Sequence, residues 1–300
     1  MSARYELAHV RDAGELVRGL DGAWATIAGS EPYTTGVFSG LPELAAVLRW
    51  GTGSDAIDIA AATEAHVAVL TTPAVNAEAV ADLALALMLA CLRRLPDLDG
   101  AVRSGRWRLE EPTRDLAGAT VGVVGLGAVG RAVTRRLRGF GCRVLAVEPS
   151  PDREFCAAFE VELTDLDAML PRVDVLTLHA PLTSGSRRLI GAAELGRLPR
   201  HAVIVNTARG ELIDQAALIE ALRERRIAGA GLDVFEREPV PPGDPILEAP
   251  GVVLTGHIAS FTELGLARTA EAVLANLREV LEGRLPAASC LNPEAWSSPG

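Results

Sequence analysis

The sequence predicts an α/β protein built from two parallel-sheet domains, with the second domain inserted into the first. Apolar runs of strand length alternate with stretches of helical periodicity, which is typical of a parallel sheet covered by helices. The alternation occurs twice, and a polar segment at 96–117 separates the two series. A long amphipathic stretch at 262–282 is expected to return to the first domain. The predicted domains are therefore 1–93 with 262–300, and 94–261.

The first domain begins with short elements. Strands are expected near 7–10, 23–28, 45–50 and 67–70, and helices near 13–20 and 57–64. A glycine turn, Gly51-Thr52-Gly53, follows the third strand. The apolar stretch Ala79–Leu92 predicts a buried helix that Asn76 caps. This stretch is too short to span a bilayer, and Asp82 interrupts it.

The second domain shows a longer alternation. The polar segment 96–117, which contains Trp107 and Pro112, is expected to be an irregular arm that precedes it. Strand Thr120–Val124 leads into a Gly-Leu-Gly turn and a helix that reaches about Phe140. Further strands are expected at 143–147, 173–178, 202–206, 229–233 and 252–254, with helices between them.

Composition excludes several functional classes. The chain has 300 residues, of which 49% are hydrophobic and 23% charged, a mixture typical of a globular enzyme. The net charge of −10 opposes binding to the phosphates of nucleic acids. All 29 basic residues are arginines, which excludes a lysine Schiff base and a P-loop lysine.

The cysteines and the first residues indicate a cytoplasmic protein without metal. Four scattered cysteines contain no C-x-x-C pair, so neither a disulfide framework nor a zinc site is expected. No Asp, Glu and His grouping has the spacing of metal ligands. The start, MSARYELAHV, lacks the apolar region of a signal peptide.

A glycine motif after the first strand of the second domain predicts a dinucleotide site. Gly125, Gly127 and Gly130 form G-x-G-x-x-G between an apolar strand and a helix. The glycines allow a tight turn, close approach of a pyrophosphate and close helix packing, while the helix N-terminus attracts phosphates. Glu148 ends the next strand and favours NAD over NADP, although Arg153 nearby opposes that preference. The alternatives are a turn without nucleotide and a methyltransferase.

Three later segments each place a polar residue after an apolar strand, where open parallel sheets bind ligands. Arg209 follows VIVNTA, and a guanidinium binds a carboxylate in a planar fork. His257 follows VVLTG and has the pKa range of a general base or acid. Glu238 is the predicted carboxylate partner that orients the imidazole and raises its pKa. Each residue alone is weak evidence; their occurrence together after a nucleotide motif predicts hydride transfer to or from a 2-hydroxy acid.

The chain resembles the D-isomer-specific 2-hydroxyacid dehydrogenase family from about Ala45 to its end. The matching segments are RWGTGSDAID, NAEAVADLALALMLA, GLGAVG, DVLTLHAPLT, VNTARGELID, GAGLDVFEREP, TGHIAS and LNPE. The segment RWGTGSDAID is most similar to the phosphoglycerate dehydrogenase branch. The resemblance implies two Rossmann-like domains, a flavodoxin-like substrate domain and an NAD-binding domain, with a cleft between them. It also implies a homodimer formed through the arm 96–117, with Trp107 at the interface.

The resemblance assigns roles to individual residues. Arg209 would bind the substrate, His257 would donate or accept the proton, and Glu238 would be its partner. Backbone N–H groups of Thr52 and Gly53 would bind the substrate carboxylate. Arg49 would meet a second anionic group such as a phosphate, or else be a surface arginine that closes a strand. The implied NAD site comprises the glycine turn with Ala128, Val129, Arg131, Glu148, His179, Ala180, Pro181, Thr207, Ala208 and Asp233.

Departures from the family pattern leave alternatives open. The front of the chain is short, so the substrate domain is expected to be trimmed, and the end leaves no room for regulatory domains. Gly256 stands where the family commonly has proline, which predicts a less preorganised histidine. Two alternatives to an ordinary dehydrogenase remain: an NADH-sensing corepressor-like binding module, and an enzyme for a phosphorylated or phosphonate substrate that uses Arg49.

Overall fold

The computed structural model describes residues 12–107 and 110–296, and the chain divides into two compact units. Unit 1 comprises Met1–Asn76 with Glu263–Gly300, and unit 2 comprises Ala77–Thr262. The C-terminal helix therefore belongs to the first unit. The strand predicted at 7–10 lies outside the described residues.

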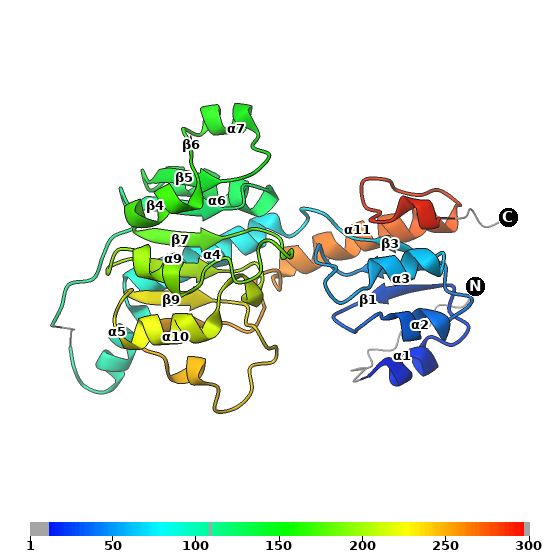
Figure 1. Ribbon diagram of the computed structural model, residues 1–300, viewed down its shortest axis with the longest axis horizontal. Coiled ribbons are helices and arrows are strands. Elements are labelled where there is room, and N and C mark those ends of the chain that lie inside the picture. The colour runs from blue at the N-terminus through cyan, green and yellow to red at the C-terminus, as the bar shows by residue number, and fades with distance from the viewer. Residues whose placement is uncertain (1–11, 108–109, 297–300) are drawn as a thin grey trace. The chain divides into compact units, whose positions relative to one another are not determined.

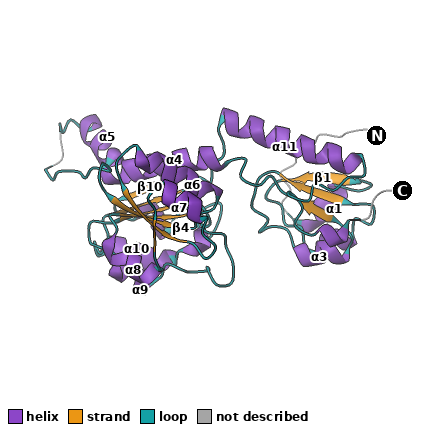
Figure 2. Ribbon diagram, turned by 90° about the horizontal axis from the view of Figure 1, so that it is seen from above, coloured by secondary structure: helices purple, strands orange, loops and turns teal. Residues whose placement is uncertain are grey.

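Unit 1 has a three-stranded parallel sheet in the order β1-β2-β3. Its elements are α1 (Ala13–Gly19), β1 (Ala25–Ala28), α2 (Thr35–Ser39), β2 (Ala46–Arg49), α3 (Ile59–Glu64), β3 (Ala68–Leu70), α11 (Glu263–Leu281) and the 3-10 turn Pro293–Ala295. Residues of β2 alternate between two cores: Val47 packs towards α1–α3, whereas Ala46 and Leu48 pack against α11. The sheet is thus covered on both faces, with α11 on one side and α1 and α3 on the other (Figure 2).

Unit 2 has a seven-stranded parallel sheet in the order β10-β9-β8-β7-β4-β5-β6. The strands are β4 (Thr120–Val124), β5 (Arg143–Val147), β6 (Glu162–Leu163), β7 (Val175–Leu178), β8 (Val203–Asn206), β9 (Gly229–Leu232) and β10 (Val252–Leu254). The helices are α4 (Ala77–Leu92), α5 (Leu95–Arg103), α6 (Ala128–Arg138), α7 (Arg153–Ala158), α8 (Leu166–Met169), α9 (Ala192–Arg197) and α10 (Gln215–Arg223), with 3-10 turns at Leu170–Arg172, Gly210–Leu212 and Pro245–Glu248. Helices α4 and α6 cover one face, and α8–α10 the other (Figures 1 and 2). The strand order reverses at β4, which lies between β5 and β7.

Two boundaries differ from the sequence predictions. The sequence assigned 77–93 to the first domain, whereas the division into units places α4 with unit 2, because its apolar residues pack in the same core as β4 and β8. The arm was predicted to be irregular, and that was wrong for residues 96–103, which belong to α5. Proline in the first turn is compatible with a helix start, and the ion pair between Arg103 and Asp99 (2.7 Å) spans one turn.

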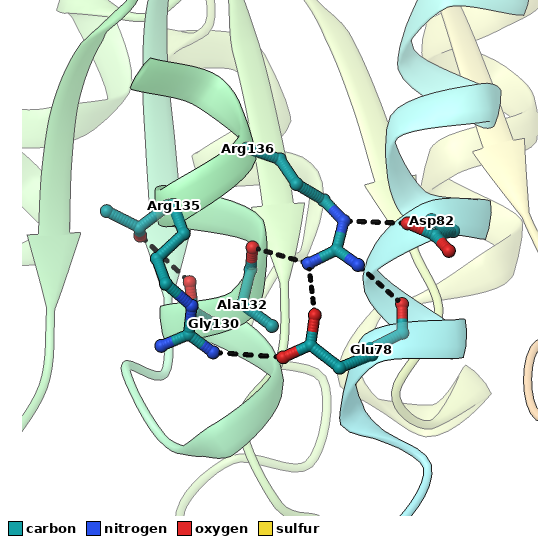
Figure 3. Close-up of polar contacts among 7 residues, drawn as sticks. Glu78, Asp82, Gly130, Ala132, Arg135 and Arg136 are labelled. Atoms are coloured by element: carbon teal, nitrogen blue, oxygen red, sulfur yellow. Dashed lines mark hydrogen bonds and ion pairs between the residues drawn. The ribbon is translucent and has the colours of Figure 1, made fainter. Parts of the chain in front are cut away.

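An ion-pair network holds α6 against α4 (Figure 3). The Arg136 guanidinium contacts a Glu78 carboxylate oxygen at 2.7 Å and an Asp82 oxygen at 2.7 Å. Arg135 contacts the other oxygen of Glu78 at 3.0 Å. Exposed ion pairs contribute little singly, but a shared network of this kind fixes the helix that follows the glycine turn.

The register of the unit 2 sheet brings the carboxyl ends of its strands into line. Val124 pairs with Val147 and Leu178, and Leu178 pairs with Asn206. Asn206 in turn pairs with Leu232. The residues that follow these strands therefore gather at one edge of the sheet, and most of the residues predicted for cofactor and catalysis are among them.

Candidate active site

The glycine turn after β4 requires two of its glycines on steric grounds. Gly125 has φ +90, and a Cβ atom there would lie 2.6 Å from the backbone nitrogen of Ala180. A Cβ atom at Gly130 would overlap the carbonyl oxygen of Gly125. At Gly127, the residue before α6, a Cβ atom would meet nothing within 4 Å. The turn is thus tight on its inner side and open before the helix, as a pyrophosphate site requires.

Glu148 lies directly beside this turn. One carboxylate oxygen accepts a hydrogen bond from the Leu126 N–H (2.8 Å), and the other accepts one from the Ser150 N–H (3.0 Å). The acid predicted to bind the ribose is therefore positioned by the turn itself. Arg131, also assigned to the cofactor site, pairs with Asp152 at 2.9 Å.

Two predicted cofactor residues carry buried polar atoms without a partner among the described residues. These atoms are Nδ1 of His179, which follows β7, and Oγ1 of Thr207, which follows β8. The His179 Nε2 atom bonds the Thr177 hydroxyl at 2.9 Å, and burial lowers the pKa of His179 to about 3. A neutral imidazole and a hydroxyl that lack partners fit a polar ligand at this edge, so the residues present fit NAD.

His257 and Glu238 form the closest polar pair of the predicted catalytic set. The Nδ1 atom of His257 lies 2.6 Å from a carboxylate oxygen of Glu238, whose other oxygen accepts the N–H of Phe235 at 3.0 Å. No described residue bonds the Nε2 atom of His257, and the side chain is 52% exposed. The imidazole is thus oriented through one nitrogen, and the other nitrogen is left for substrate.

The pair shifts both pKa values in the direction that favours ionisation. The hydrogen bond to Glu238 raises the pKa of His257 above its ordinary value and outweighs burial. Burial alone would raise the pKa of Glu238, but the hydrogen bonds from His257 and the Phe235 N–H lower it. The positive charge of Arg209 lowers the pKa of both groups. The structure thus pairs His257 with Glu238 directly, and the catalytic role of Arg209 stays a prediction.

Asn206 positions the loop that carries Arg209. Its amide donates to the Arg209 carbonyl at 2.8 Å, and its side-chain oxygen accepts the Ala208 N–H at 3.0 Å. Asn206 was not among the site residues predicted from the sequence. The available cue in the sequence was a polar amide side chain at the end of the apolar strand VIVN. In the structure Asn206 is completely buried.

Asp233 organises the loop that carries His257. Its buried carboxylate accepts hydrogen bonds from the Thr255 hydroxyl (2.6 Å), the Ile258 N–H (2.9 Å) and the Ala259 N–H (2.9 Å). Its carbonyl accepts the N–H of His257, which has φ +54. These contacts fix the loop on both sides of Gly256, so they supply preorganisation that the sequence analysis did not expect. The predicted contact of Asp233 with nicotinamide stays a prediction.

The predicted substrate residues of unit 1 lie on the turn after β2. Thr52 is exposed, and no described residue accepts a hydrogen bond from the N–H groups of Thr52 or Gly53. Arg49 differs, because its guanidinium bonds three backbone carbonyls, those of Ala28, Trp50 and Gly53. Two amides that lack partners fit a carboxylate, whereas Arg49 is engaged with its own domain.

In residues 12–107 and 110–296, no group of at least three His, Cys, Asp or Glu side chains has the geometry to hold a metal ion. Within the same residues, no helix has the length and apolar character needed to cross a membrane.

Comparison with known proteins decides the family. A model of the NAD-binding domain of D-isomer specific 2-hydroxyacid dehydrogenases matches residues 85–259. The chain belongs to this family. It is thus an NAD-dependent 2-hydroxyacid dehydrogenase with two Rossmann-like domains, as the resemblance implied.

Relatives of this dehydrogenase cover most of its length. A glyoxylate reductase of Korarchaeum cryptofilum is 41% identical over 262 residues, which are 86% of this chain and 79% of that protein. A D-3-phosphoglycerate dehydrogenase of Methanocaldococcus jannaschii is 37% identical over 84% of this chain, but over 48% of its own length. The structure of an Aquifex aeolicus D-lactate dehydrogenase complexed with NAD and lactic acid matches with a TM-score of 0.86 and 26% identity, covering 92% of this chain and 89% of that one.

Proposed function

We propose that this dehydrogenase interconverts a small 2-oxo acid and the corresponding D-2-hydroxy acid. NAD, when bound at the glycine turn, supplies or accepts the hydride at C2 of the substrate. Arg209 binds the carboxylate and polarises the oxo group, because its guanidinium presents a fork of donors. His257 Nε2 donates the proton to the oxygen in reduction and removes it in oxidation. Glu238 stabilises the charged imidazole, and the N–H groups of Thr52 and Gly53 bind the substrate carboxylate.

The His257–Glu238 contact of 2.6 Å is the observation that carries this proposal. It supplies an oriented general acid at the sheet edge where the glycine turn also lies. The test is NADH oxidation with glyoxylate, pyruvate, hydroxypyruvate and 3-phosphohydroxypyruvate, followed by chiral analysis of the product. We expect turnover with at least one of them and a D product. Tight NADH binding without turnover on any member of the panel would contradict the proposal.

The pH dependence of turnover tests the role of Glu238. In reduction His257 must be protonated, so kcat falls as pH rises through its pKa, which Glu238 holds above the ordinary value. Glu238→Gln removes the negative charge that raises the pKa of His257, so the fall in the reduction rate moves to lower pH. The rise of the oxidation rate with pH moves to lower pH as well. His179 cannot produce the profile, because its pKa of about 3 keeps it neutral. A profile that Glu238→Gln leaves unchanged would contradict the assignment.

We also propose that α5 and the segment after it pair two copies of the chain. Leu95, Val102 and Trp107 are exposed apolar side chains there, and Trp107 is 86% exposed. We expect the mass in solution to be that of a dimer, and Val102→Asp with Trp107→Ala to shift it towards the monomer. A monomeric wild-type protein at micromolar concentration would contradict this proposal.

A further inference from the structure

The turn that follows β2 has a fixed backbone. Gly51 has φ +124, a backbone conformation that residues other than glycine rarely adopt. The Gly51 carbonyl accepts the N–H of Thr72 at 3.0 Å, and the Thr52 hydroxyl donates to the Thr72 carbonyl at 3.1 Å. Thr72 therefore holds the turn from the side of β3.

Arg49 holds the same turn from the side of β1. Its Nε donates to the Gly53 carbonyl at 2.8 Å, and its Nη1 donates to the Trp50 carbonyl at 2.6 Å and to the Ala28 carbonyl at 3.3 Å. One planar guanidinium thus links the two ends of the turn to the last residue of β1. The carbonyls of residues 50, 51 and 53 all accept hydrogen bonds from within the domain, and the N–H groups of Thr52 and Gly53 bond no described residue.

We propose that Arg49 is a positioning residue that holds this turn in the shape that binds a carboxylate, and that the substrate is a 2-oxo acid without a phosphate. The inference rests on the proposed function, because it takes the amides of Thr52 and Gly53 as the carboxylate site. The three carbonyls engage the Nε and Nη1 donors of Arg49, so a phosphate could take these donors only by displacing the backbone of the turn. The resemblance to phosphoglycerate dehydrogenases had assigned Arg49 to such an anion, and the observed contacts give it a different task.

The two roles of Arg49 predict different behaviour of a conservative variant. A phosphate ligand needs positive charge, which lysine retains. The positioning role, called the clamp below, needs a planar fork that reaches several carbonyls at once, which lysine lacks. Arg49→Lys should therefore behave like Arg49→Met if the clamp is correct, and like the wild type towards a phosphorylated substrate if it is not.

The experiment measures kcat and KM for hydroxypyruvate and 3-phosphohydroxypyruvate, which differ by one phosphate, in the wild type, Arg49→Met and Arg49→Lys. Arg284→Met is the matched control, since Arg284 is an exposed arginine of unit 1 paired with Glu279. We expect the wild type to prefer hydroxypyruvate. Both Arg49 variants should raise KM by about 10- to 100-fold for both substrates with little change in kcat, because a misplaced turn loses binding equally in ground and transition states. The NADH Kd should stay unchanged.

Two kinetic outcomes would overturn the proposal. One is a wild type that prefers the phosphorylated substrate by orders of magnitude, with the preference lost in Arg49→Met and kept in Arg49→Lys. Another is an unchanged KM in Arg49→Met. If no substrate turns over, calorimetry of oxamate binding to the NADH complex separates the two hypotheses. Weaker oxamate binding in both Arg49 variants would support the positioning role of Arg49 even though the proposed turnover fails. Equal oxamate binding by all variants would overturn that role. No oxamate binding by the wild type would overturn both that role and the proposed function.

Discussion

Replacing His257 with asparagine should lower kcat for 2-oxo acid reduction by about 10²- to 10⁴-fold, the usual contribution of a positioned general acid. Asparagine can still bond Glu238 but cannot deliver a proton at neutral pH. The remaining rate should lose the dependence on pH that the wild type shows. Binding of NADH, measured by protein fluorescence or calorimetry, should change little, because the glycine turn and Glu148 lie after other strands.

A second histidine of unit 2 gives a matched control. His201 also pairs with a carboxylate, at 2.9 Å from Asp174, but it lies before β8 rather than after a strand's carboxyl end. His201→Asn should leave kcat unchanged. Equal rates in His257→Asn and the wild type would show that another group supplies the proton.

Replacing Arg209 with methionine should lower kcat/KM for a 2-oxo acid by about a thousandfold or more. The change removes charge-assisted hydrogen bonds to the substrate and stabilisation of the charge that develops on its oxygen. Arg209→Lys keeps the charge but loses the planar fork, so its kcat/KM should lie between those of the methionine variant and the wild type. Steady-state kinetics with a saturating concentration of NADH measure both.

The pKa of His257 provides a second readout for Arg209. The guanidinium lowers that pKa, so Arg209→Met should raise it and move the pH profile of the residual activity upwards. Arg197→Met, at an exposed ion pair with Asp167, is the control for losing an arginine of the same unit. A loss of NADH binding or of folding stability with an unchanged kcat would contradict the assigned role.

Most of the strands and long helices of the described chain could be predicted from the sequence. The strand Thr120–Val124 and the turn after it were recognisable because a buried parallel strand is a continuous apolar run and only glycine fits the first position that follows, Gly125. Short elements such as α2 and β6 were missed, since five- and two-residue segments carry no measurable periodicity. The helix α5 was missed because its polar composition hid a start at proline.

Some residues of the candidate site could likewise be predicted from the sequence, and others could not. His257, Glu238 and Arg209 could be selected by residue type and by their place after apolar strands, since parallel strands align their carboxyl ends. The roles of Asn206 and Asp233 could not, because each depends on hydrogen bonds within loops whose course no local pattern encodes.

The sequence by itself determined the chemistry available to this dehydrogenase, because residue types and strand ends set which groups gather at the sheet edge. Only the tertiary structure decided how Arg49 is used. Its side chain reaches the carbonyls of Ala28 and Gly53, and Ala28 lies on another strand. The partners of a long, flexible side chain depend on backbone groups that folding brings near, and a charge pattern along the chain does not specify them.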